Sequence, residues 1–248
     1  MKVIIKKDYD AMGKETAKYF AEVIRNKPNA VLGLATGSTP ISTYKELIRL
    51  HEEEDLDFSQ VTTFNLDEYL GLTGNHDQSY RYFMDTNLFN HVNIKKENTN
   101  VLSGVAGNPE AECKEFEEKI KAAGGIDIQL LGAGGNGHIA FNEPGSPENS
   151  RTRVVDLTKE TIKDNSRFFE KVENVPTQAL SMGIETILEA KKIVIIANKE
   201  SKAKVVALSI EGPVATDVPA SVLQKHSDVI WVIDKGAASL LKNQPPLA

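Results

Sequence analysis

A glycine-rich stretch near the middle of the chain presents an amide, an imidazole and a carboxylate close together. An apolar run ends in LLGAGGNGHIAFNEP, in which Asn136, His138 and Glu143 accompany the glycines. Glycine adopts backbone dihedrals that other residues avoid, so the chain can turn sharply or approach a ligand closely. Histidine titrates near neutral pH, and Glu143 could accept a hydrogen bond from one ring nitrogen while the other meets a substrate. We therefore interpret His138 as an acid/base group that Asn136 and Glu143 assist.

The same glycines match a dinucleotide-binding fingerprint, G-x-G-x-x-G, at residues 132–137, and Asp156 follows about 20 residues later. That fingerprint needs a helix directly after the glycines. Here Pro144, Gly145 and Pro147 follow instead, so any helix is at most a turn or two long. We therefore reject a nicotinamide cofactor. Metal binding by His138 is also disfavoured, because no second histidine or carboxylate cluster with ligand spacing lies nearby.

Two adjacent carboxylates follow another apolar run, in FNLDEY, at Asp67 and Glu68. Adjacent strand residues point to opposite faces, so the two carboxylates should not act as a close pair, and one should face a crevice. A partly buried aspartate there could serve as a general base, since desolvation raises its pKa. The alternative is a turn carboxylate that caps the loop through Gly71 to Gly74.

The segment ATGSTP, residues 35–40, has the composition of an anion-binding loop. Gly37 permits a tight turn, the N–H groups of the next helix point at whatever precedes it, and the hydroxyls of Ser38 and Thr39 can add hydrogen bonds. The alternative is an ordinary helix cap. The lysine of a Walker A loop is missing from the segment. Lys202 opens a later helix, where a cation would suit the same anion.

Composition limits the classes of protein that this chain can belong to. Its 248 residues, 40% hydrophobic and 26% charged, are typical of a globular protein, and we expect one domain over 1–248. A net charge of -6 disfavours nucleic-acid and anionic-membrane partners. Cys113 is the only cysteine, which suits a reducing compartment. We find no signal peptide or membrane helix pattern and expect a cytoplasmic protein.

Apolar periodicity predicts strands that alternate with helices. This order is typical of an α/β, doubly wound, mainly parallel sheet with helices on both faces, a modified Rossmann-like architecture. The predicted strands are Val3–Ile5, Ala30–Thr36, Val61–Leu66, Ile126–Leu131, Ile193–Ala197 and Val229–Ile233. Helices are predicted around 17–24, after Pro40, and near 79–91, 108–124, 177–190 and 201–210, with a short one near Ala220. The irregular, proline-containing segment 142–176 is predicted to be a mobile lid rather than core.

In open α/β sheets, ligands bind beyond the carboxyl ends of the strands. That rule selects four loops for one site, and the polar motifs described above fall in them: Thr36–Thr39, Asp67–Tyr69, Gly132–Glu143 and Asn198–Lys202. We therefore expect these loops to line a common crevice.

Five motifs together resemble the glucosamine-6-phosphate deaminase family, along nearly the whole chain. They are GHIAFNEP, FNLDEY, ATGSTP, SRTR at 150–153 and NSRFF at 165–169. The resemblance implies that a small sugar phosphate, glucosamine 6-phosphate, reacts with water to give fructose 6-phosphate and ammonia. This is an aldose–ketose isomerisation coupled to deamination, in the use of amino sugars, and it needs no organic cofactor.

The resemblance also implies roles for individual residues. Asp67 corresponds to the base that moves a proton between C2 and C1 of the sugar. His138 corresponds to the group that assists opening of the pyranose ring, tuned by Glu143 and Asn136. Ser38, Thr39, Arg167 and Lys202 match phosphate-holding positions, and the expected substrate-binding set also includes Thr36, Gly37 and Gly134.

Two departures from the family pattern stand out. Asn136 replaces an aspartate of some members, so it can orient His138 but supplies no charge, and electrostatic support would come from Glu143. Longer, hexameric members are activated by N-acetylglucosamine 6-phosphate through basic residues near SRTR. Here Arg153 remains, Val155 replaces a lysine, and the chain stops soon after Leu241. We expect a monomer or small homo-oligomer without that activation.

Two other functions remain open. A sugar-phosphate hydrolase of the 6-phosphogluconolactonase kind is similar in the glycine-histidine loop, but it is not expected to need FNLDEY or FNEP. A non-catalytic sugar-phosphate sensor on the same scaffold would be expected to lack Asp67 or His138, and both are present.

Overall fold

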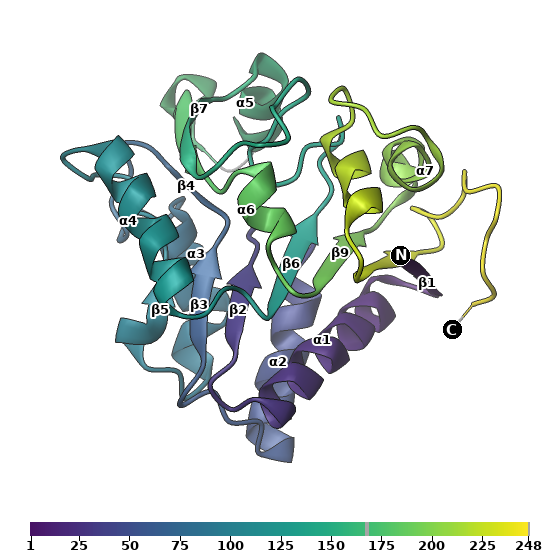
Figure 1. The fold of residues 1–248 in the computed structure, drawn as a ribbon, viewed down its shortest axis with the longest axis horizontal. Coiled ribbons are helices and arrows are strands. Elements are labelled where there is room, and N and C mark those ends of the chain that lie inside the picture. The colour runs from purple at the N-terminus through teal and green to yellow at the C-terminus, as the bar shows by residue number, and fades with distance from the viewer. Residues whose placement is uncertain (167–168, 248) are drawn as a thin grey trace.

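The computed structural model describes residues 1–166 and 169–247, and its centre is a parallel β-sheet (Figure 1). Within these residues seven strands pair in parallel in the order β1-β10-β9-β6-β2-β3-β5. They are β1 Lys2–Lys6, β2 Val31–Leu34, β3 Thr62–Asn65, β5 Thr99–Asn100, β6 Ile128–Gly132, β9 Ile193–Ala197 and β10 Val229–Asp234. Each predicted strand is present, and the short edge strand β5 is an addition.

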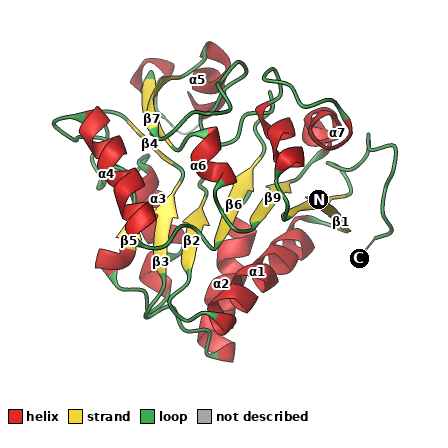
Figure 2. Ribbon diagram, viewed as in Figure 1, coloured by secondary structure: helices red, strands yellow, loops and turns green. Residues whose placement is uncertain are grey.

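Helices cover both faces of this sheet, as predicted (Figure 2). The chain runs β1, β2, β3, β5 in one direction across the sheet and β6, β9, β10 in the other. Because crossovers between parallel strands are right-handed, the two runs place their helices on opposite faces. One run carries α1 Tyr9–Asn26, α2 Ile41–Glu54 and α3 Tyr80–Asn87; the other carries α4 Pro109–Ala122, α6 Ile184–Leu188 and α7 Ala203–Glu211. The doubly wound fold is therefore confirmed.

Local sequence explains where several helices begin. Asp8 accepts the N–H of Ala11 at the start of α1, and Asn108 accepts the N–H of Ala111 at the start of α4. Short 3-10 segments fill other connections: η1 Phe89–His91, η2 Lys96–Asn98, η4 Val172–Asn174, η5 Glu200–Lys202 and η6 Pro219–Lys225. The predicted short helix near Ala220 is η6. None of the helices in the described part of the chain has the length and apolar character to cross a membrane.

A second, antiparallel sheet of three strands lies beyond the carboxyl ends of the central strands, at the top of Figure 1. It is formed by β4 Asp67–Tyr69, β8 Gln178–Ser181 and β7 Arg153–Asp156. The predicted helix 177–190 is therefore wrong in its first half, because β8 precedes the short helix α6. Apolar side chains at 179, 180, 184 and 187 fit a helical period across both elements. Pairing of β8 with strands far away in sequence decides the structure instead.

The segment 142–176 is more ordered than the sequence suggested. It contains β7, α5 Lys159–Asn165 and η4, and it buries the side chains of Asn142, Thr152, Leu157 and Val175. The segment was predicted to be a cover more than a core, and these residues nevertheless contribute buried side chains. Its position over the carboxyl ends of the strands fits a cover (Figure 1). Its motion stays a prediction.

Candidate active site

A cavity of about 330 Å³ opens where the four selected loops meet. The sheet explains its position, because the chain leaves β2 toward β3 and leaves β6 toward β9, in opposite directions, although β2 and β6 are neighbours. The loops after two such strands part and leave a crevice between them. The cavity is lined by residues 35–41, Asp67, Tyr69, residues 77–80, Gly132–Gly135, His138, Phe141 and Lys202, with Thr161, Asn165 and Phe169 of the covering segment among the others.

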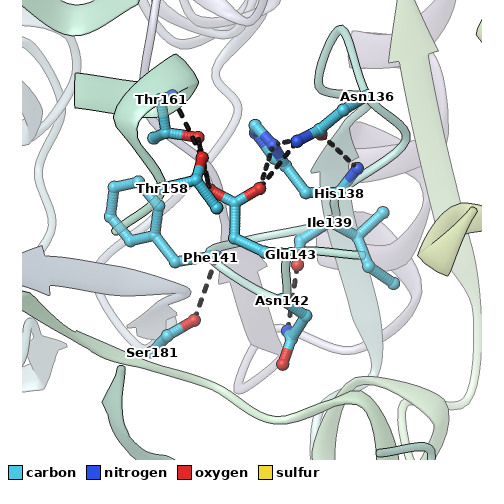
Figure 3. Close-up of polar contacts among 9 residues, drawn as sticks. All are labelled: Asn136, His138, Ile139, Phe141, Asn142, Glu143, Thr158, Thr161 and Ser181. Atoms are coloured by element: carbon cyan, nitrogen blue, oxygen red, sulfur yellow. Dashed lines mark hydrogen bonds and ion pairs between the residues drawn. The ribbon is translucent and has the colours of Figure 1, made fainter. Parts of the chain in front are cut away.

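The imidazole of His138 is oriented by Asn136 (Figure 3). The amide oxygen of Asn136 lies 2.8 Å from Nδ1 of His138 and also accepts the backbone N–H of His138 at 3.1 Å. An amide oxygen only accepts, so Nδ1 must carry the proton in this contact. The other ring nitrogen, Nε2, can then exchange a proton with a bound molecule.

Glu143 supports the Asn136–His138 pair and is itself held by several hydrogen-bond donors (Figure 3). Its Oε2 accepts the amide of Asn136 at 2.8 Å and lies 3.4 Å from Nδ1 of His138. Its Oε1 accepts the hydroxyls of Thr158, at 3.2 Å, and Thr161. Burial raises the pKa of Glu143, but the hydrogen bonds and the charge of His138 outweigh burial and lower that pKa to about 2. Glu143 is therefore a fixed negative charge behind the histidine.

The sequence suggested that His138 donates directly to Glu143. In the structure its nearer acceptor is Asn136, and Glu143 acts mainly through Asn136 and by its charge. Thr158, the N-cap residue of α5, and Thr161 within that helix are additional partners of Glu143 that the sequence did not reveal. A helix cap at Thr158 was readable from the sequence, but its proximity to Glu143 was not.

A tight turn carries the chain from His138 to Glu143. Ala140 has φ of 51°, a left-handed conformation that side chains other than glycine seldom adopt. Asn142 holds the turn, because its amide nitrogen donates to the carbonyls of Ile139 at 2.9 Å and Met182 at 2.8 Å. Arg153 donates to the amide oxygen of Asn142 at 2.9 Å. Arg153, the second arginine of the SRTR motif, is thus hydrogen-bonded inside the fold.

Asp67 lines the cavity opposite this network, whereas Glu68 does not. Only 7% of Asp67 is exposed, and burial, together with the charge of Glu68, raises its pKa to about 8. A base with a pKa in this range suits proton transfer near neutral pH. The prediction that one of the two carboxylates faces a crevice is confirmed, and that carboxylate is Asp67. The two are nevertheless coupled, because the charge of Glu68 acts on Asp67. Glu68 accepts N–H groups at the start of α3 and does not cap the Gly71–Gly74 loop.

The loop before α2 is shaped by an unusual glycine and a tyrosine. Gly37 has φ of 96°, and the hydroxyl of Tyr9 donates to the carbonyl of Ser38 at 2.6 Å while it accepts the N–H of Ser42 at 3.1 Å. The N-cap position of α2 is Pro40, whose side chain has no acceptor. The N-cap residue therefore supplies no side-chain cap to α2, although Tyr9 takes the N–H of Ser42, and this favours an anion site over the ordinary cap.

Lys202 reaches the same cavity from η5, in the loop after β9. The loop is held by two contacts: the hydroxyl of Thr39 donates to the side-chain oxygen of Asn198 at 3.3 Å, and the N–H of Lys199 binds both carboxylate oxygens of Asp234 at 3.0 and 3.1 Å. The structure thus joins Thr36–Thr39 and Lys202 in one site. The expected phosphate ligand Arg167 lies outside the described residues.

Aromatic side chains form one wall of the cavity and were not foreseen as a group. The ring centroids of Tyr69 and Tyr80 are 4.8 Å apart, those of Tyr80 and Phe141 are 6.1 Å apart, and Phe169 lies 5.9 Å from Tyr69. They come from four separate segments, so sequence spacing gave no signal. Among the described residues, no three His, Cys, Asp or Glu side chains are placed to hold a metal ion.

Comparison with known proteins agrees with this geometry. The model of the family described as glucosamine-6-phosphate isomerases/6-phosphogluconolactonase matches residues 7–231. A protein of Clostridium perfringens (strain 13 / Type A) named glucosamine-6-phosphate deaminase is 54% identical over 242 residues, which are 98% of this chain and 100% of that protein. A protein of Thermoanaerobacter sp. (strain X514) with the same name is 52% identical, covering 98% of this chain and 96% of its own.

Solved structures divide into near and distant neighbours. A structure described as a monomeric glucosamine-6-phosphate deaminase superposes with a TM-score of 0.95 at 46% identity, covering 97% of this chain and 100% of that one. A 6-phosphogluconolactonase from Trypanosoma cruzi reaches a TM-score of 0.76 at 19% identity, covering 98% and 97%, and so shares the fold. From the family model and the near relatives, the chain belongs to the glucosamine-6-phosphate deaminase family.

Proposed function

We propose that this chain converts glucosamine 6-phosphate and water to fructose 6-phosphate and ammonia. The observation that carries the proposal is the cavity itself, in which the Asn136–His138–Glu143 network, the buried base Asp67 and the loop before α2 face one another. The high identity to relatives that bear the deaminase name supports the same reaction.

The phosphate group would bind at the start of α2. The backbone N–H groups of that turn, the hydroxyls of Ser38 and Thr39, and the ammonium of Lys202 supply donors and positive charge. Thr36, Gly37 and Gly134 line the same cavity and would contact the substrate through their backbone. We include Arg167 in this set on the strength of the NSRFF motif.

Ring opening would depend on His138. Opening the pyranose requires a proton to leave the anomeric hydroxyl and another to reach the ring oxygen. Nε2 of His138 is available for this transfer because Nδ1 is engaged with Asn136. The negative charge of Glu143 stabilises the imidazolium that forms when the ring takes up a proton.

Isomerisation would depend on Asp67. Its carboxylate would remove the proton from C2 of the open-chain sugar and return it at C1. The amine leaves C2 once that carbon has the oxidation level of a ketone, and water supplies the oxygen of the product. Because Asp67 is buried, its charged form is poorly solvated, which raises its pKa and makes it a stronger base.

Two alternatives to the deaminase are a 6-phosphogluconolactonase, which shares the fold, and a non-catalytic sugar-phosphate sensor. The solved 6-phosphogluconolactonase from Trypanosoma cruzi is only 19% identical to this chain, so it supports only a common scaffold. The purified protein should release ammonia from glucosamine 6-phosphate and leave 6-phosphogluconolactone unhydrolysed. Lactone hydrolysis without ammonia release would favour the lactonase, and binding of the amino sugar without turnover would favour the sensor.

We further propose a monomer or small homo-oligomer that N-acetylglucosamine 6-phosphate does not activate. The engagement of Arg153 with Asn142 and the neutral Val155 support this, since both positions are basic anchors in activated relatives. The near structural neighbour is described as monomeric. A cytoplasmic location is proposed from the unpaired thiol of Cys113, which suits a reducing compartment. Sedimentation of the purified protein, with and without the activator, tests the first proposal.

A further inference from the structure

Glu68 is a buried carboxylate that binds three backbone N–H groups. Its Oε1 accepts from Tyr69 at 2.8 Å and from Tyr80 at 2.9 Å, and its Oε2 accepts from Arg81 at 3.0 Å. Only 1% of Glu68 is exposed. Tyr80 and Arg81 are the first two residues of α3, so a single side chain joins β4 to the start of that helix.

The helix does not need this carboxylate as its cap. Ser79 occupies the N-cap position of α3 and accepts the N–H of Tyr82 at 3.1 Å. No lysine or arginine of the described residues pairs with Glu68 either, since the guanidinium of Arg81 binds Asp85, at 3.2 Å, and Thr99. Backbone dipoles therefore stabilise the charge of Glu68 without cancelling its field.

The hydrogen bonds of Glu68 fix two cavity residues, Asp67 and Tyr80, relative to each other. Asp67 directly precedes Glu68 in β4, and Tyr80 donates its backbone N–H to the Glu68 carboxylate; both Asp67 and Tyr80 line the cavity. We propose that Glu68 is a positioning residue for the base Asp67, fixing β4 against α3 with its hydrogen bonds and strengthening the base with its charge. This inference rests on the proposed role of Asp67.

The charge of Glu68 can act on Asp67 because the two residues are adjacent in β4 and both are buried. Burial raises the pKa of Asp67, and the neighbouring negative charge of Glu68 raises it further. Burial also raises the pKa of Glu68, although its three N–H donors oppose that shift. Opposite Asp67, β8 contributes the neutral Ser181. Among the described residues, the other titratable or charged groups that line the cavity are Tyr69 of β4, Asp77 and Tyr80 at α3, His138 after β6 and Lys202 of η5.

The pH dependence of turnover tests this role. Glu68→Gln keeps the size of the side chain but removes the charge and one of the two acceptor oxygens, so Asp67 should lose its proton more readily. The acid limb of kcat/KM should move down by about one pH unit, and kcat at high pH should fall because the weaker base transfers protons more slowly. KM should change little, since Glu68 does not line the cavity.

A matched control separates charge from structure. Glu117 is a second buried carboxylate, which accepts hydrogen bonds from Thr152, Thr186 and Arg151 and does not line the cavity. Glu117→Gln should lower the stability of the fold and leave the acid limb where it is in the wild type. An unmoved limb in a folded Glu68→Gln protein, or an equal movement in Glu117→Gln, would overturn the inference.

A titration that needs no turnover gives an independent test. Glu68 has the lower pKa of the pair, so it ionises first and the coupling appears in the titration of Asp67. Carbon-13 NMR of labelled aspartate and glutamate carboxyl groups in the wild type should show Asp67 losing its proton after Glu68, with a pKa of about 8, and Glu68→Gln should lower that pKa. Loss of the Asp67 proton before the Glu68 proton in the wild type would refute the strengthening of the base by Glu68 even if Glu68→Gln fails to fold. Absence of ammonia release by the wild type would instead refute the proposed function, and the coupling between Glu68 and Asp67 would still hold.

Discussion

The imidazole of His138 lies directly against Gly134. A β-carbon at Gly134 would fall 2.3 Å from Nε2 and from Cε1 of the ring, which no real contact permits. The backbone N–H of Gly134 also donates to the carbonyl of His138 at 2.9 Å, closing the loop between them. Only glycine at position 134 therefore leaves the ring in its place facing the cavity.

Substitution of this glycine should misplace the histidine. In Gly134→Ala the ring must rotate or the loop must shift, so kcat should fall by about 100-fold or more, the scale of a lost acid/base group. Gly107→Ala is the control, because a β-carbon there meets nothing within 4 Å. Steady-state kinetics with thermal unfolding of both variants would check this. Normal kcat in Gly134→Ala would show that the ring position is not required.

The neutral amide of Asn136 should be needed for its geometry. Asn136→Ala removes the acceptor for Nδ1 of His138 and the donor to Glu143, so kcat should drop about 10- to 100-fold with little change in KM. Asn136→Asp keeps the acceptor and adds a charge, so it should retain more activity than Asn136→Ala. Steady-state kinetics of both variants measures the two effects. Equal activities of the two variants would contradict an orienting role.

Lys202 should act in substrate binding. Lys202→Ala removes an ammonium that lines the cavity beside the loop before α2, so KM should rise about tenfold or more while kcat changes little. Lys204 lies two residues later on the exposed side of α7 and serves as the control. Its alanine variant should keep the wild-type KM. A KM that is the same in both variants would remove Lys202 from the anion site.

Burial of Asp67 should cost stability at high pH. Its folded pKa, about 8, lies above its ordinary value of 3.8, so the folded state binds the proton more tightly than the unfolded chain. Stability is therefore greatest below pH 4 for this group and declines as the pH rises through 8. At pH 9, Asp67→Asn should be more stable than the wild type by about 1–2 kcal/mol, and the gap should close near pH 4. Urea unfolding at both pH values would check it; a wild type that is the more stable at pH 9 contradicts the burial argument.

Sequence patterns were sufficient where burial dominates. Runs such as Ile193–Ala197 and Val229–Ile233 are apolar on both faces, as a covered parallel strand requires, and the strand-end rule then placed the motifs at one edge of the sheet. The second sheet was missed because β4 and β8 are short and depend on each other across more than a hundred residues of chain.

Long-range polar contacts in the site could not be read from the sequence for the same reason. Spacing in FNEP says nothing of Thr158 and Thr161, which lie in a later helix and donate to Glu143. Likewise, two of the three N–H groups that Glu68 binds follow it by 12 and 13 residues. They belong to the backbone, so the pattern of side chains in the sequence does not indicate them. Family resemblance identified the chemical groups, and tertiary structure showed which of them touch.

The central claim is that this cavity isomerises and deaminates glucosamine 6-phosphate with Asp67 as the base. Its most direct test measures ammonia and fructose 6-phosphate together, in wild type and in Asp67→Asn, with substrate binding followed by calorimetry. The wild type should release the two products in equal amounts, and the variant should bind the sugar phosphate about as well but lose at least about 100-fold in turnover. Ammonia release by Asp67→Asn at the wild-type rate would contradict the assignment of the base, and no ammonia from the wild type would contradict the proposed function.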